Sequence, residues 1–157
     1  MAGLNDITYI NSDIRVFIPL GKLNKNIKRA QYWLDGAIMD SMTPYMPMVT
    51  GNFIQRTRAM SAAIQGSGQV CAAAPPYGRY LYEGKVMVET TGQPAFYIEG
   101  VGFRHHIGST LIPTGKDLNY TSTFHPGVQS HWFEPAKRTH EKEWKNGVRR
   151  ILWGSKT

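Results

Sequence analysis

Residues 75–89 read PPYGRYLYEGKVMVE, and this stretch decides how the chain can be arranged. The double proline favours an extended backbone, because each proline fixes its own φ and disfavours the helical region for the residue before it. Gly84 marks a turn, and residues 85–89 then alternate polar and apolar side chains, as a half-buried strand does. We therefore predict an extended, tyrosine-bearing segment over 76–82, a pivot at Gly84 and a strand over 85–89 whose valines face the core.

The rest of the chain predicts two long helices and several short strands. Apolar residues recur at helical spacing over about 22–42 and 131–152. Strands are expected over 7–20 (one, or two with a turn at 11–13), 69–73, 96–103 and 109–113, with a hairpin-type turn at 66–68. Residues 53–63 could form a strand or a helix, and the alternation of Arg56 and Arg58 favours a strand. Residues 113–130 have no clear period and are expected to form a long loop. This order predicts one α+β domain, in which an antiparallel sheet is flanked by the two helices.

Composition indicates a globular chain with a basic C-terminal part. The 157 residues suit one domain, and 41% of them are apolar, 18% charged and 11% aromatic. The net charge is +7, and residues 131–157 hold seven Lys or Arg against three acids. A basic cluster over 22–29 opens the first helix, where the helix dipole disfavours it; it is either a solvated face or meets an acidic neighbour.

Several classes of function find no support in the residues. Gly115-Lys116 lacks both the Ser/Thr and the upstream glycine of a phosphate-binding loop. His125 and His131 could converge but lack a third metal ligand, and no nucleophile stands in a catalytic motif. Cys71 is the single cysteine, and no run of about 20 apolar residues or signal peptide is present. We therefore expect no enzyme activity, no cofactor, no metal and no membrane partner.

The basic final helix permits weak contact with nucleic acid. The residues that could face DNA are Lys142, Lys145, Arg149 and Arg150. Acids interleave this helix, and its apolar stripe indicates that it packs against the core first. Sequence-independent contact with phosphates is therefore the most that this helix predicts.

At this point the sequence resembles a known family. Residues 76–88, PYGRYLYEGKVMV, are similar to the signature PYAxYLYxGKVMV of the minor capsid or tail-completion proteins of long-tailed bacteriophages. Residues 125–137, HPGVQSHWFEPAK, resemble the segment that opens the final helix of that family, and residues 49–51 resemble its Thr-Gly turn. Gly78 stands where the family commonly has alanine, which is expected to loosen the segment, and residues 90–124 match nothing in the family.

The resemblance implies a structural protein of the virion, made in the host cytoplasm. Related proteins form a ring, usually a hexamer, at the head–tail junction, where they terminate the tail tube and join it to the capsid connector. The implied partners are copies of the chain itself, the tail tube protein, the head connector or stopper protein, and the genomic DNA that passes through. The family has no catalytic residues to carry over.

Two further functions stay open, and one set of contact residues is expected. The ring could instead be a head-closure (stopper) or connector ring below the portal, or the protein could be a weak, sequence-independent DNA-binding protein. Aromatic side chains with few charges suit interface cores, so the tyrosine run and the loop 113–130 are the expected subunit contacts. Either Tyr80 or Tyr82 could be buried instead. The expected contact residues are Tyr77, Arg79, Tyr80, Tyr82, Lys85, His125 and Trp132.

Overall fold

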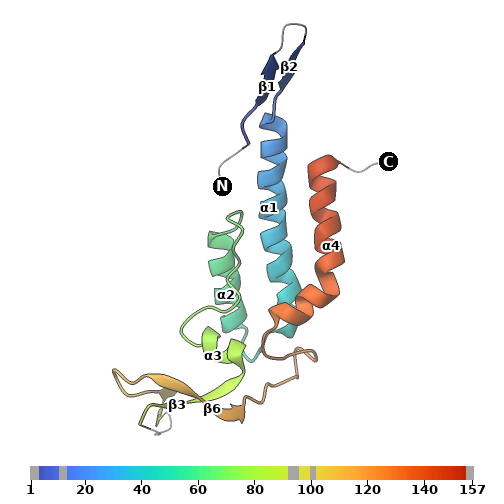
Figure 1. Ribbon diagram of the computed structural model, residues 1–157. Coiled ribbons are helices and arrows are strands. Elements are labelled where there is room, and N and C mark those ends of the chain that lie inside the picture. The colour runs from blue at the N-terminus through green and yellow to red at the C-terminus, as the bar shows by residue number, and fades with distance from the viewer. Residues whose placement is uncertain (1–3, 11–13, 92–95, 100–101, 155–157) are drawn as a thin grey trace.

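The computed structural model describes residues 4–10, 14–91, 96–99 and 102–154, and it confirms the α+β class predicted from the sequence (Figure 1). Its elements in chain order are β1 (Ile7–Ile10), β2 (Arg15–Ile18), α1 (Gly21–Met42), a 3-10 turn η1 (Thr43–Tyr45), α2 (Asn52–Ala63), α3 (Gly78–Glu83), β3 (Lys85–Glu89), β4 (Phe96–Ile98), β5 (Gly102–Arg104), β6 (Leu111–Asp117) and α4 (Phe133–Trp153).

The two long helices, α1 and α4, lie side by side and antiparallel, as Figure 1 shows. At one end of the pair, the Asn26 amide donates a hydrogen bond to the Leu152 carbonyl oxygen at 3.2 Å. Further along, the Trp144 indole N–H donates to the Ser41 hydroxyl at 3.2 Å. The predicted helices over 22–42 and 131–152 are therefore confirmed, but they pack against each other and do not flank a sheet.

The core sits between the C-terminal half of α1, the start of α2 and the first turns of α4. Trp132 is its largest fully buried side chain, and the rings of Phe53 and Tyr82 pack edge-on against the indole. Apolar area buried by aromatic rings stabilises the fold, and edge-to-face ring pairs add to it. The other buried members of the cluster are Met39, Met42, Met46, Ile54, Ala136 and Trp144.

Residues 53–63, predicted as a strand, form helix α2 instead. Ile54, Thr57 and Ser61 are buried on one face, which is helical spacing. Two of these three are polar, so the apolar pattern missed the helix. The Thr57 hydroxyl donates to the Phe53 carbonyl oxygen at 2.9 Å, which satisfies it within the helix.

Residues 69–73, also predicted as a strand, have no strand partner. The backbone N–H of Cys71 donates to the Ser61 hydroxyl at 2.9 Å, and that hydroxyl donates to the Cys71 carbonyl oxygen at 3.1 Å. The Trp132 indole donates to the Ala72 carbonyl oxygen at 2.9 Å. Side chains of α2 and of the core thus form hydrogen bonds with backbone groups of this segment, which a neighbouring strand would otherwise have paired.

The tyrosine-bearing segment is helical rather than extended, because residues 78–83 form α3. Gly84 ends this helix with φ of +70°, so the predicted pivot at Gly84 and the strand after it are both confirmed. Gly78 is buried, and a Cβ there would lie 2.5 Å from the Ala73 carbonyl carbon. Gly78 therefore allows close packing, and the expectation that it loosens the segment is wrong.

Within the part of the chain that the structure describes, the strands form three separate antiparallel ribbons of two strands each rather than one sheet. β1 pairs with β2, β4 with β5, and β3 with β6 at the end of the molecule away from the β1–β2 hairpin (Figure 1). Residues 113–117 of the expected loop belong to β6, so the long loop is shortened to 118–130. The turn predicted at 11–13 lies outside the described residues, and residues 66–68 form a turn that follows α2.

Candidate assembly surface

The β1–β2 hairpin projects beyond the N-terminal end of α1, away from the other elements (Figure 1). Directly opposed residues of an antiparallel pair share one face, and here Ile7 faces Ile18 and Tyr9 faces Val16. One face of the hairpin is therefore entirely apolar. Every described residue of both strands is exposed to solvent, so nothing in the described chain covers this face.

Polar contacts fix the base of the hairpin to α1. The Asp6 carboxylate accepts a hydrogen bond from the Leu20 backbone N–H at 2.7 Å, just before α1 begins. Asn24 exchanges two hydrogen bonds with Leu4, through its side-chain oxygen at 2.9 Å and its amide nitrogen at 2.7 Å. These contacts hold the hairpin at the end of α1, so its apolar face is presented in a set direction.

Exposed apolar side chains lie on both faces of this hairpin and beside it. Eight apolar side chains on it and beside it each expose between 39% and 62% of their surface. At roughly 100 Å² for each half-exposed side chain, the four residues of the apolar face expose on the order of 400 Å², which lies within the 300–600 Å² of the largest patch on a typical monomer, a patch that is often functional. The eight residues are Leu4, Ile7, Tyr9, Ile10, Ile14, Val16, Phe17 and Ile18.

The expected contact residues around α3 divide into exposed and packed side chains. Tyr77 is 56% exposed and Arg79 is also exposed, whereas Tyr80 is half-buried. The centroid of the Tyr82 ring lies 4.8 Å from the ring centroid of Trp132 and 5.1 Å from the ring centroid of His131. Burial raises the pKa of the Tyr82 hydroxyl, and Glu134 and Glu83 raise it further, so this hydroxyl stays protonated.

The other three expected contact residues are engaged within the chain. Lys85 forms an ion pair with Asp117 across the β3–β6 ribbon. His125 is half-buried, with Nδ1 at 2.7 Å from the Met46 carbonyl oxygen, to which it donates. The side chain of Trp132 has 0% exposure, so the expectation that it lies in a subunit contact is wrong.

The four expected DNA-facing residues are all exposed on α4, and two of them, Lys145 and Arg149, line one hollow. Lys145 forms an ion pair with Glu141 at 2.6 Å, which satisfies its charge. This pair and the Lys137 charge keep the pKa of Glu141 low, with the Lys145 hydrogen bond as the main cause. Arg149 and Arg150 lie in the last turns of the helix, at the end that carries the hairpin (Figure 1).

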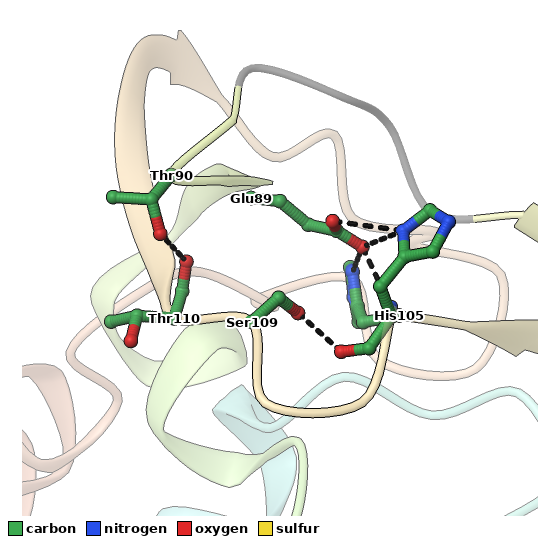
Figure 2. Close-up of polar contacts among 6 residues, drawn as sticks. Glu89, Thr90, His105, Ser109 and Thr110 are labelled. Atoms are coloured by element: carbon green, nitrogen blue, oxygen red, sulfur yellow. Dashed lines mark hydrogen bonds and ion pairs between the residues drawn. The ribbon is translucent and has the colours of Figure 1, made fainter.

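A buried carboxylate, Glu89, forms the most connected polar cluster at the end of β3 (Figure 2). Its side chain is 1% exposed and accepts hydrogen bonds from the His106 backbone N–H at 2.8 Å and the His106 ring Nδ1 at 2.9 Å. The backbone hydrogen bond is the main cause that lowers the pKa of Glu89, and Nδ1 of His105 lies 3.6 Å from the same carboxylate.

Neighbouring contacts show what this cluster does. The Thr90 hydroxyl donates to the Thr110 carbonyl oxygen at 2.9 Å, and the Ser109 hydroxyl donates to the His106 carbonyl oxygen at 2.7 Å. These bonds fasten the 105–110 loop to the end of β3 (Figure 2). Across the described parts of the chain, no three His, Cys, Asp or Glu side chains are placed to hold a metal ion.

Comparison with protein-family models, with curated proteins and with solved structures found no match to this chain. Among the described helices, none combines the length and the apolar character that crossing a membrane requires. Sequence reasoning expected strands over 7–20 but missed their role as an exposed surface. The only signal was that both strands are rich in Ile, Val, Phe and Tyr without charges on one face.

Proposed function

We propose that this protein is a structural subunit that assembles with copies of itself into a ring at the head–tail junction of a tailed bacteriophage. The observation that carries the self-assembly is the uncovered apolar face of the β1–β2 hairpin. The resemblance of residues 76–88 to tail-completion proteins supports the place of that ring in the virion.

Physical chemistry favours a second copy of the chain as the cover for the hairpin. An isolated two-stranded ribbon is marginal in water, and it gains stability when further strands or a helix cover its apolar face. The apolar face, on the order of 400 Å², supplies about half of the roughly 800 Å² that one partner buries in a standard protein–protein interface, so the interface also needs surface beside this face. Because every copy of the chain carries the same hairpin, each subunit in an assembly of copies would contribute this apolar face to an interface.

A closed ring needs a second, different patch on each subunit, because its interfaces are heterologous. A groove of about 500 Å³ between α1 and α4 offers one, with Leu34, Ile38 and Val148 among its lining residues. Its rim carries charges, including the Glu141–Lys145 ion pair. An apolar floor with a charged rim is the usual composition of an interface.

Replacing the apolar face tests the proposal directly. In a variant with Ile7, Tyr9, Val16 and Ile18 all changed to Thr, the strands keep a residue with high strand preference but lose the apolar area. We expect the wild-type protein to form closed rings by electron microscopy and light scattering. The variant is expected to run as a monomer with an unchanged circular dichroism spectrum.

A matched control removes the same kind of area elsewhere. Val49, Ile64, Ile107 and Ile112 are exposed apolar residues outside the hairpin, and changing all four to Thr should leave the rings intact. A wild-type protein that stays monomeric at high micromolar concentration would overturn the proposed assembly. Rings that survive in the hairpin variant would show that another surface carries the contact.

The place of the ring is tested in the virus. A phage that lacks a tail terminator would leave DNA-filled heads beside separate, over-long tails. A phage that lacks a stopper would leave heads that lose their DNA. Electron microscopy of particles made without this protein therefore decides between the terminator and the stopper position.

A further inference from the structure

Two basic segments that lie far apart in the sequence meet at one end of the molecule. Because α1 and α4 are antiparallel, the first turns of α1 lie beside the last turns of α4 (Figure 1). The first segment brings Lys22 and Arg29, and the second brings Arg149 and Arg150. We call these four side chains the basic end.

The basic end surrounds a groove. A hollow of about 800 Å³ is lined by Lys22, Arg29 and Arg150, with Leu23 and other apolar side chains between them. Arg149 lines an adjoining hollow of about 640 Å³. Trp153 lines both hollows, and its side chain is 73% exposed.

No acid of the described chain neutralises the basic end. Three other cations, Arg58, Lys85 and Lys145, each have a carboxylate partner. None of the four basic-end side chains has an ion pair or hydrogen bond among the residues that the structure places. Among the described acids, Asp35 and Glu143 are closest to them along the chain, and both are engaged elsewhere. Asp35 accepts hydrogen bonds from the Gln31 side chain and the Gly66 backbone N–H, and Glu143 pairs with His140.

Electrostatics therefore makes this end strongly attractive to anions. The first turn of α1 contains no acid. The positive dipole end of α1 lies beside the negative dipole end of α4, so the side-chain cations and not the helix dipoles supply the attraction. Four unpaired cations around one groove repel each other, and this repulsion is relieved when several negative charges bind together. A chain of phosphates supplies such spaced charges, and an exposed indole beside them can stack on a base.

The structure assigns to the basic end a binding site for the phosphodiester backbone of a nucleic acid, without sequence specificity. The contacts are phosphate oxygens to Lys22, Arg29, Arg149 and Arg150. Trp153 lies beside the path of the chain. This site goes beyond the proposed ring and does not depend on it, because one subunit holds all of its residues.

The test measures binding of fluorescent duplex and single-stranded 20-mers of mixed sequence at increasing salt. Neutralising four phosphates gives a slope of log K against log salt of about −3.6 for the duplex. We therefore expect affinity to fall roughly a hundredfold between 50 and 200 mM salt. Lys22→Gln with Arg150→Gln should reduce the magnitude of the slope by about 2.

A charge-matched control separates the site from net charge. Arg79→Gln with Lys116→Gln removes two exposed cations from the other end of the molecule and should leave the slope unchanged. Binding should also change the fluorescence of Trp153, as shown by loss of that signal in Trp153→Phe.

Three results would overturn the assignment. These are no binding at 50 mM salt, the same weakening in the control as in the Lys22 and Arg150 variant, or binding to anionic phosphatidylserine vesicles with none to nucleic acid. If the ring proposal holds, the Thr variant of the hairpin is a monomer. Nucleic-acid binding by this monomeric variant would show that the binding site does not depend on ring assembly, so each proposal can fail without the other.

Discussion

Gly147 sets how closely α1 and α4 approach, and we predict that Gly147→Ala destabilises the protein although alanine is the better helix former. A Cβ at this position would lie 2.0 Å from Cη2 of Trp33 and 2.3 Å from Cζ3. Real Cβ atoms essentially never come within 3.0 Å of another heavy atom. The indole is rigid, so the ring, or the helix that carries it, must move by an ångström or more.

The net effect follows from two opposing terms. Alanine in place of glycine inside a helix gains up to about 1 kcal/mol from propensity. Forcing an extra carbon into a close-packed site costs about 1–3 kcal/mol, and the short distances place this case toward the upper limit. We expect Gly147→Ala to lower the free energy of unfolding by about 1–2 kcal/mol. That corresponds to a fall in melting temperature of roughly 2–8 °C for a domain of this size.

Urea denaturation followed by circular dichroism measures this difference. The matched control is Gly21→Ala at the first residue of α1, where a Cβ would have nothing within 4 Å, so stability should stay or rise. Combining Gly147→Ala with Trp33→Leu should cost less than the sum of the single changes, since the smaller side chain removes the clash. A Gly147→Ala protein at least as stable as the wild type would refute this account of the helix contact.

Two further predictions concern the β3 end of the molecule. Gly84→Ala should lower the free energy of unfolding by about 1–2 kcal/mol or more, because Gly84 has φ of +70° and an added Cβ would lie 2.6 Å from the Cβ of Ser130. Gly108 has φ of +81° but no neighbour within 4 Å, so urea denaturation of Gly108→Ala measures the backbone cost alone. Glu89 has a lowered pKa in the folded protein, so its contribution to stability is present above the unfolded carboxyl pKa of about 4.3 and is lost as pH falls through its folded value. Urea midpoints measured from pH 6 to pH 3 should therefore fall less steeply for Glu89→Gln than for the wild type, and parallel curves would contradict this.

Sequence patterns predicted the elements whose burial is apolar and periodic. The predicted stripe of α1 includes Ala30, which is buried, and Leu34, which is half-buried, and that of α4 includes Ala136 and Trp144, which are both buried. The turn at Gly84 could be predicted because only a residue without Cβ adopts its φ at low cost. These are local constraints, so one chain segment contains all the information they need.

Elements with polar buried faces could not be predicted in this way. In α2, Thr57 and Ser61 are buried because their hydroxyls bind the backbone around Cys71 and Ala74. Those partners lie at least ten residues away, so no local window contains both halves of the contact. The same limit applies to Glu89, whose partner His106 reaches it only through the fold of the 105–110 loop.

The β1–β2 hairpin shows a different limit. Its alternation of apolar residues correctly predicts strands, and such alternation normally means that one face packs on the core of the same chain. In this structure, the face with Ile7 and Tyr9 is exposed to solvent. The same pattern therefore indicates a face that is buried only when another molecule covers it. A sequence pattern indicates that a face must be covered, but it does not indicate whether the covering surface belongs to the same chain.

The hairpin and the basic end lie together at the end of the molecule opposite the β3–β6 ribbon (Figure 1). Subunits joined through their hairpins would therefore bring their unpaired cations close together. Such a cluster would be self-repelling unless an anion lay among the subunits, and assembly should then tighten binding of nucleic acid.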